Sequence, residues 1–462
     1  MRRGMLPPMR IIPTLLLGLL AAACATRQQP ETQLEPGTAV ETFDAAWGIV
    51  YETHFDTTFN GVDWLALKDE LRPEAEAAQD IGDLRVVIRE MLDRLGQSHF
   101  ALIPGEAVDS ADSVEDGDSG SDVGDAGLDV RLIEEMVLVS RVDSGGPAEA
   151  AGVEPGWVVR SIDDDDMDEL LGVARASAEE RPLEVLMWLR VMARLSGSKG
   201  SVKRVQFLDG DGANQTVEIE LGPNPGSPVR FGNFPTFFNR FHSRRVTSDG
   251  VDVGVIWFNN WMVPAIAQVD RAVNEFRELD GIVVDLRGNT GGLGAMVMGV
   301  AGHFYEVRTP LGTMKTRRND LQFFANPRFS DRAGNRVRPF AGPVAILTDE
   351  ITASASEMFA GGMQTTGRVR VFGETTMGAV LPAVTDLLPS GDVLYHALGD
   401  FTTANGESLE GVGVIPDERV PLSRDDLLAG RDPPLMAALR WIEEQSLSDS
   451  NPAGRTGNKW RM

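Results

Sequence analysis

The pattern of apolar positions changes character along the chain. From residue 42 to residue 95, apolar side chains recur at helical spacing and Gly96 is a fitting helix stop; the clearest series is Leu84, Ile88, Met91, Leu92 and Leu95. Beyond residue 250, apolar runs typical of buried strands (251–258, 281–285 and 343–347) alternate with a helical pattern over 266–276. This alternation predicts a sheet covered by helices.

A stretch of short strands and glycine-rich turns lies between these two regions. Two strand-like runs flank a short helix that Pro147 begins and Gly152 ends. Helical spacing over 168–195 is broken near Pro182, and a hairpin is predicted around the turn at 209–212. The chain is therefore expected to be an α/β multidomain protein, with an N-terminal helical domain (42–108), a β-rich domain (127–225) and an α/β domain (226–445).

Further segments differ in composition from the folded regions. Residues 1–24 combine basic residues, an apolar run too short to span a bilayer, and small residues before the only cysteine, Cys24. Residues 25–41 predict a polar tether, residues 109–126 a solvated acidic linker, and residues 446–462 a flexible tail. The start resembles a bacterial lipoprotein signal, which implies lipidation of Cys24; a simple cleavable signal is the alternative.

Composition narrows the range of partners and cofactors. The 462 residues are 42% hydrophobic, enough for several cores, and 43 basic against 69 acidic residues give a net charge of −26. Such a charge repels nucleic acid and anionic membrane surfaces, so a lipid anchor is the only membrane attachment expected. One cysteine allows neither a disulfide framework nor a cysteine-rich metal site, and we expect no metal or cofactor.

A serine at a strand-to-helix turn is the first candidate for catalysis. The apolar run that ends at Leu347 is followed by small residues around Ser354 and by a helical pattern from Met358. A helix N-terminus beside the hydroxyl supplies unpaired N–H groups and a positive dipole, which stabilise an oxyanion. The same pattern has a purely structural interpretation, because Ser354 and Glu357 also fit a capping box.

A glycine-rich loop is the second candidate. The buried strand 281–285 runs directly into Leu286-Arg287-Gly288-Asn289-Thr290-Gly291-Gly292. Glycines there allow successive N–H groups to point at one anion, so the loop could supply half of an oxyanion hole. Taken alone, it is also an ordinary turn.

Together these motifs resemble the C-terminal processing and tricorn-core serine peptidases. Four segments occur in the order typical of the family: the loop 285–292, the run Ser354-Ala355-Ser356-Glu357, the segment 373–378 and the late segment 409–417. The resemblance covers residues 42–445. It implies that the three regions are an N-terminal helical domain, a PDZ-like domain and a ClpP/crotonase-like α/β catalytic domain.

The resemblance also implies which residues carry the chemistry. One version of the family pairs the serine with a lysine, but Ala379 stands at that position and cannot accept a proton. The other version uses a histidine preceded by a serine, together with a late glutamate, and Ser98, His99 and Glu410 stand in those places. Ser354 is then the nucleophile and His99 the general base, since an imidazole exchanges protons near neutral pH.

The remaining expectations concern the oxyanion hole and the PDZ-like domain. The backbone N–H groups of Ala355 and of Gly292, or alternatively Gly291, are expected to hold the oxyanion. The PDZ-like loop is expected to capture a peptide carboxylate on backbone N–H groups and consists of Gly127, Leu128, Asp129 and Val130. The Asp129 charge repels a carboxylate, so gating or binding of internal segments is the alternative.

The sequence therefore predicts an exported serine peptidase, lipid-anchored at the periplasmic face of the cell envelope, on the outer membrane. Its expected partners are polypeptide substrates, unfolded or with exposed carboxyl termini. Two alternatives stay open. A catalytically inactive relative would bind a peptide or another ligand, and a crotonase-like acyl-thioester enzyme needs no exposed nucleophilic serine. Labelling with a fluorophosphonate probe separates them from a peptidase.

Overall fold

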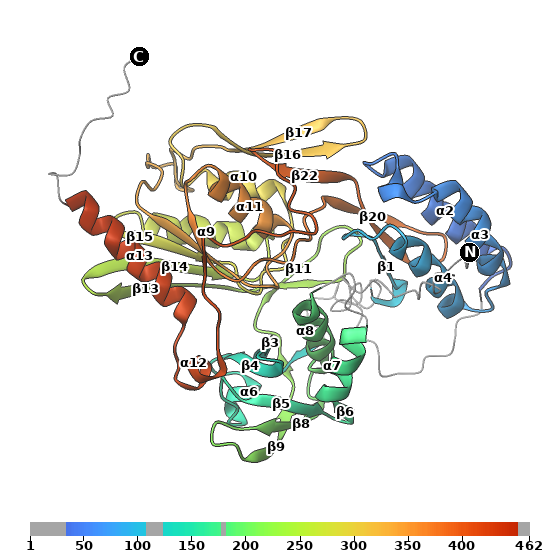
Figure 1. Cartoon of the computed structure of the whole chain (residues 1–462), viewed down its shortest axis with the longest axis horizontal. Coiled ribbons are helices and arrows are strands. Elements are labelled where there is room, and N and C mark those ends of the chain that lie inside the picture. Colours follow the sequence, from blue (N-terminus) through green and yellow to red (C-terminus); the bar gives the residue numbers. More distant parts are fainter. Residues whose placement is uncertain (1–33, 108–122, 177–181, 451–462) are drawn as a thin grey trace, which may run out of the picture.

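The computed structural model describes residues 34–107, 123–176 and 182–450 (Figure 1). The predicted leader with Cys24, and most of the predicted tether and acidic linker, lie outside the described residues. The remainder is a mixed α/β protein of several domains with helices at its N-terminal end, as expected. In Figure 1 the N-terminal helices and the middle region border different sides of the C-terminal α/β region.

The N-terminal region consists of three helices, α2 (Thr38–Thr53), α3 (Trp64–Ala77) and α4 (Ile81–Asp93), with a 3-10 turn at Phe59–Gly61. Asp63 and Asp80 cap α3 and α4 by accepting hydrogen bonds from backbone N–H groups in the first turn. A distant hairpin completes their core: β20 (Ala383–Leu387) and β21 (Val393–Ala397) form a sheet with β1 (Ala101–Ile103). Leu381, Leu388, Leu394 and Ala397 belong to the same buried cluster as Phe43 and Trp64.

The middle region is built on an antiparallel sheet. Its strand order is β3 (Leu128–Ile133), β4 (Met136–Val142), β5 (Val158–Ile162), β8 (Val202–Leu208) and β9 (Asn214–Glu220), with β6 (Asp165–Asp166) beside β5. The helices are α6 (Pro147–Ala150), α7 (Met167–Ala176) and α8 (Leu183–Arg194). A second small sheet has the order β10 (Gly222–Pro223), β2 (Val123–Asp125) and β7 (Gly197–Ser198).

The C-terminal region contains the sheet that positions the candidate site. Its order is β13 (Phe241–Ser248), β14 (Val251–Phe258), β15 (Gly281–Asp285), β18 (Val344–Thr348), β19 (Arg370–Gly373) and β23 (Glu418–Arg419). All neighbours are parallel except β13 and β14. Alternate side chains face opposite layers: Ile256, Val284 and Ile346 share one cluster, and Val255, Val283 and Ala345 share another.

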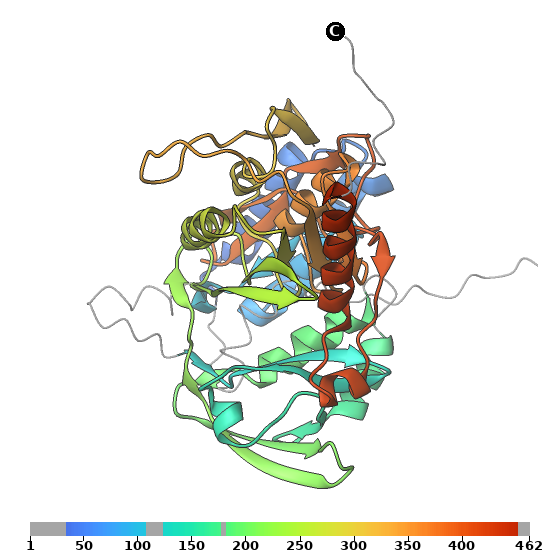
Figure 2. The same cartoon turned by 90° about the vertical axis from the view of Figure 1, so that its left-hand side faces the viewer.

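Helices cover both faces of this sheet. The first cluster includes residues of α9 (Val263–Glu275), α10 (Ala295–Ala301) and α11 (Ala355–Thr365), and the second includes α13 (Pro433–Ser450). A further sheet, β17 (Asp320–Ala325), β16 (Thr309–Thr316) and β22 (Gly399–Thr403), contacts α10 and α11. A short hairpin joins β11 (Ser227–Val229) to β12 (Phe237–Asn239). The turned view in Figure 2 shows α12 (Arg424–Leu428) reaching the middle region, where Arg424 donates to the Gly156 carbonyl at 3.0 Å.

Three predicted boundaries need correction. Helix α2 begins at Thr38, inside the predicted tether 25–41, because Ala39 and Phe43 pack into the helical core. The predicted linker 109–126 ends in β2, which pairs with two strands far along the chain. Helix α13 runs through Ser450, beyond the predicted start of the tail at residue 446, as a continuation of a helix packed on the sheet.

Candidate active site

Ser354 lies at the junction between β18 and α11. The buried strand β18 ends at Thr348, at the carboxyl edge of the parallel strands, where α/β sheets place their sites. Ser354 has φ 55° and ψ −118°, a conformation that costs a non-glycine residue about 1–3 kcal/mol. The turn therefore holds the serine immediately ahead of α11, next to the positive end of the helix.

Glu357 does more than complete a capping box. Its carboxylate accepts a hydrogen bond from Ser354 N at 2.9 Å, and also from Thr376 Oγ1 (2.6 Å), Gly378 N (2.7 Å) and Ala379 N (3.0 Å). Complete burial raises the pKa of Glu357 to about 7, although these hydrogen bonds oppose the change. Glu357 thus fastens the serine to the segment that carries Gly378 and Ala379.

Ser356, the other serine in this turn, is engaged in packing. It is fully buried, and its Oγ accepts a hydrogen bond from Trp261 Nε1 at 2.8 Å and donates to the Asn289 carbonyl at 3.3 Å. Ser354 is only partly buried. Of the two hydroxyls, that of Ser354 is the one that a substrate can reach.

The glycine-rich loop lies directly against the serine turn. The Asn289 carbonyl accepts a hydrogen bond from Ala353 N at 3.0 Å. Gly291 has φ 97°, and a Cβ there would lie 2.6 Å from Ser354 Cβ and 3.1 Å from Ala355 N, so only glycine permits this approach. The N–H of Gly291 itself donates to Asn289 Oδ1 at 3.0 Å, so it is already occupied.

Ser98, His99 and Glu410 form one hydrogen-bonded chain. Ser98 Oγ lies 2.7 Å from His99 Nδ1 and donates to Glu410 Oε2 at 3.0 Å, while Ser98 N donates to Glu410 Oε1 at 2.9 Å. Burial raises the pKa of Glu410, and the hydrogen bonds oppose this change. Because the Ser98 hydroxyl has one proton and gives it to Glu410, it accepts from Nδ1–H of the imidazole. Nε2 of His99 is then unprotonated and able to act as a base.

One dipeptide joins the serine and histidine parts of the site. Ser354 N donates to the Ala379 carbonyl at 2.9 Å, and the next residue, Val380, donates its N–H to Glu410 Oε2 at 2.9 Å. Ser354 and Glu410 are therefore both hydrogen-bonded to the dipeptide 379–380. The structure thus brings Ser354, Ser98 and Glu410 into one neighbourhood, with His99 bonded to Ser98.

Asp349 is a site residue that the sequence analysis did not single out. Its Oδ1 accepts hydrogen bonds from Gly288 N at 2.9 Å and Thr352 N at 3.1 Å, so it fixes both the glycine loop and the serine turn. Its Oδ2 pairs with Arg131 of the middle region at 2.8 Å, and Ile351 packs into that region's core. The available signal was Asp-x-x-Thr after a buried strand, a pattern typical of an Asx turn.

The predicted peptide-binding loop is not a loop in the structure: Gly127 precedes β3, and Leu128, Asp129 and Val130 lie within that strand and pair with β4. The Asp129 carboxylate accepts a hydrogen bond from Trp188 Nε1 at 2.9 Å and pairs with Arg131 at 2.9 Å, and Arg141 lies 3.9 Å away. Burial acts to raise the pKa of Asp129, but the charges of Arg131 and Arg141, together with the hydrogen bonds from Trp188 and Arg131, lower it below its ordinary value. Its charge is thus compensated inside the region.

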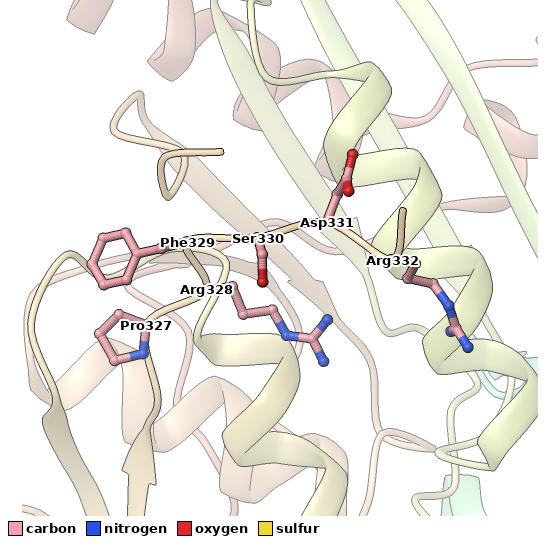
Figure 3. A pocket seen from close by; sticks show the side chains of 6 residues that line it. All are labelled: Pro327, Arg328, Phe329, Ser330, Asp331 and Arg332. Atoms are coloured by element: carbon pink, nitrogen blue, oxygen red, sulfur yellow. The ribbon is translucent and has the colours of Figure 1, made fainter. Parts of the chain in front are cut away.

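Three further kinds of feature concern the described part of the chain: metal sites, membrane-spanning helices and pockets. No group of three or more histidine, cysteine or acidic side chains there is placed to hold a metal ion, and no helix there is long and apolar enough to cross a bilayer. A surface pocket is lined by residues 327–332, and Figure 3 shows Phe329 pointing away from Asp331 and Arg332. Arg328 in this pocket pairs with Asp270 at 2.8 Å, and none of the predicted site residues lines it.

Comparisons with known proteins show what this chain is similar to. Residues 252–420 match the model of peptidase family S41, and residues 40–93 match the tricorn protease C1 domain. The chain is 26% identical over 385 residues to a carboxyl-terminal-processing protease of Picosynechococcus sp., covering 81% of this chain and 82% of the relative. It is 25% identical over 381 residues to one of Synechocystis sp., covering 81% and 79%.

Solved structures are similar in fold. The photosystem II D1 C-terminal processing protease superposes with a TM-score of 0.56 at 22% identity, covering 88% of this chain and 97% of that chain. A structure of mature CPAF complexed with lactacystin gives a TM-score of 0.54 at 11% identity, covering 89% and 98%. At these identities the likeness shows the fold alone.

Proposed function

We propose that this chain is a serine peptidase of family S41 that hydrolyses peptide bonds with Ser354 as nucleophile and His99 as general base. The observation that carries the proposal is the chain Glu410–Ser98–His99, which fixes the imidazole tautomer and is tied to the serine turn through residues 379–380. In this version of the site no lysine is used, because Ala379 stands where that residue would be.

The reaction proceeds in two halves. The Ser354 hydroxyl attacks the scissile carbonyl carbon and its proton moves to Nε2 of His99. When the C–N bond breaks, this proton passes to the leaving amine and an acyl-enzyme remains. Water then attacks the acyl carbon, His99 takes one of its protons, and that proton returns to the Ser354 oxygen as the new carboxylic acid leaves.

Backbone N–H groups stabilise the tetrahedral oxyanion. We assign this role to Ala355, the first residue of α11, and to Gly292, since the N–H of Gly291 is held by Asn289. Gly291 instead provides the close approach of the loop to Ser354. Ser98 and Glu410 orient the imidazole and stabilise the cation that forms during catalysis.

The remaining parts of the proposal concern domains, substrate and location. We assign the middle region as PDZ-like and the C-terminal region as a ClpP/crotonase-like catalytic domain. The substrates are polypeptides that are unfolded or expose a carboxyl terminus. The chain is exported and anchored to the periplasmic side of the envelope through Cys24; a Cys24→Ser variant that stays in the membrane fraction would contradict this anchor.

The test of the chemistry uses fluorophosphonate labelling and digestion of an unfolded protein such as casein. Wild type is expected to be labelled and active, Ser354→Ala to lose both properties, and His99→Ala to lose about 10³-fold or more in rate. Ser356→Ala, which removes the buried neighbouring hydroxyl, is the matched control and should remain labelled. Casein hydrolysis by Ser354→Ala or His99→Ala at near the wild-type rate would refute the assignment.

A further inference from the structure

Three aromatic rings form a continuous series that begins at the base candidate. The Tyr395 ring lies 5.5 Å from the His99 ring, and Phe234 packs edge-on against Tyr395 at the same centroid distance. Phe231 stacks on Phe234 at 6.5 Å. These spacings are those of interacting aromatic pairs. We call Phe231, Phe234 and Tyr395 the aromatic strip.

The aromatic strip is assembled from two segments that are far apart in the sequence. Phe231 and Phe234 come from the loop between β11 and β12, and Tyr395 comes from β21. Tyr395 pairs with Ala101 of β1, two residues after His99, so the strip begins beside the base. The loop also passes over β20, because a Cβ on Gly232 would lie 3.7 Å from Thr385 Oγ1.

Packing explains only the inner part of the strip. Phe234 and Tyr395 are partly buried against a small cluster that includes Ala101, Ile103 and Val393. Phe231 is different, because 47% of its surface is exposed. Phe231 is not an isolated exposed ring, because it continues into the partly exposed Phe234 and Tyr395, and a connected apolar surface is the kind that marks an interaction site.

The mechanism indicates which part of a substrate lies there. The base that receives the nucleophile's proton returns it to the leaving amine, so His99 lies on the amine side of the scissile bond. Groups that extend outward from the imidazole, away from the serine turn, therefore border the residues that follow the cleavage point. The aromatic strip begins beside the His99 ring, so this argument assigns it to the amine side of the scissile bond.

We infer that the aromatic strip binds an apolar or aromatic side chain of the segment released as the amine product. Phe231 and Phe234 form the contact surface, and Tyr395 holds them next to His99. The inference rests on the proposed function and adds a substrate class: polypeptides with a large apolar side chain shortly after the scissile bond. Direct contact between rings and substrate makes the strip a specificity determinant.

The experiment is an unbiased peptide-library digest read by mass spectrometry, with wild type and three variants. In wild type, large apolar residues are expected to be enriched at the first positions after the cleaved bond. Phe231→Ser is expected to reduce that enrichment by roughly 5- to 10-fold while cleavage of peptides without such residues continues, and Phe231→Leu is expected to keep most of it. Phe329→Ser, which alters an exposed phenylalanine (53%) of the pocket in Figure 3, is the matched control and should retain the wild-type pattern.

The outcomes separate this inference from the proposed function. Active wild type without enrichment after the bond would overturn the inference and leave the peptidase assignment intact. A uniform loss of cleavage in Phe231→Ser, with unchanged residue frequencies, would also overturn it, because that result marks a purely structural role. Wild type that neither cleaves peptides nor reacts with the fluorophosphonate would overturn the proposed function, and the inference with it.

Discussion

Replacing Gly291 by alanine tests whether the close approach of the glycine loop controls the nucleophile. The new Cβ would lie 2.6 Å from Ser354 Cβ, 2.9 Å from the Ala353 carbonyl oxygen and 3.1 Å from Ala355 N. Ordinary contact begins at 3.4 Å, so the loop and Ser354 must separate by about 0.8 Å. Two of the three atoms are backbone atoms at the start of α11, so no side-chain rotation relieves the contact.

A displacement of this size has a calculable effect on rate. Misplacing a reacting group by ~1 Å costs roughly 10²-fold, so we expect kcat/KM on casein and the rate of fluorophosphonate labelling to fall by about that factor. The φ of 97° adds a separate stability cost of about 1–2 kcal/mol for any residue with a Cβ. Both quantities can be measured on one preparation, by kinetics and by denaturant unfolding.

Gly212→Ala is the matched control. Gly212 has φ 82°, and a Cβ at this position would meet no atom within 4 Å, so the variant shares the backbone cost without the contact at Ser354. It should unfold at lower denaturant concentration yet keep wild-type kinetics. If Gly291→Ala hydrolyses casein within roughly threefold of Gly212→Ala, the loop does not position the nucleophile and the reasoning fails.

Three further expectations concern charged groups. In Glu410→Gln the side-chain amide can donate a hydrogen bond to Ser98, where the carboxylate only accepts one, and this permits the wrong tautomer of the His99 imidazole. The kcat on casein should therefore fall about 10²-fold or more. The control Glu407→Gln changes an exposed glutamate and should leave kcat unchanged. Arg131→Met removes the ion pair of the buried Asp349 and the closer of the two ion pairs of Asp129, and should cost about 3–5 kcal/mol in denaturant unfolding. Arg175→Met, which breaks an exposed pair, should cost about 1 kcal/mol or less. The pKa of Glu357 is about 7 in the folded protein, against an ordinary value of 4.5, so the free energy of unfolding should fall by on the order of 3 kcal/mol as pH rises from 4.5 to 7. Glu357→Gln should flatten this dependence of the unfolding free energy on pH. Equal slopes in the two proteins would contradict the last expectation.

Local pattern was sufficient for three strands of the central sheet, β14, β15 and β18, and for the serine turn. The apolar runs 251–258 and 281–285 coincide with β14 and β15, because strands buried on both faces are continuous in sequence. The break near Pro182 falls between α7 and α8 as predicted. The expectation of a serine-type peptidase is confirmed by the match to family S41.

What escaped prediction depends on partners that are distant in sequence. Nothing near residues 383–397 indicates that this hairpin closes the helical core, because its partner strand is β1. The pairing of Arg131 with Asp349 likewise joins two regions whose contact is decided only when both have folded. Phe231 and Phe234 look like ordinary loop residues until Tyr395 is placed beside them.

The hairpin of β20 and β21 has a consequence for biosynthesis. A ribosome releases the N-terminal helices long before residues 381–397, yet those residues complete the helices' buried cluster. Until most of the polypeptide has emerged, the hydrophobic surface of the N-terminal helices is therefore incomplete. Ser98, which bonds to His99, also lacks its partner Glu410 until then. In the mechanism that we propose, hydrolysis therefore cannot begin before the segment with Glu410 has been synthesised.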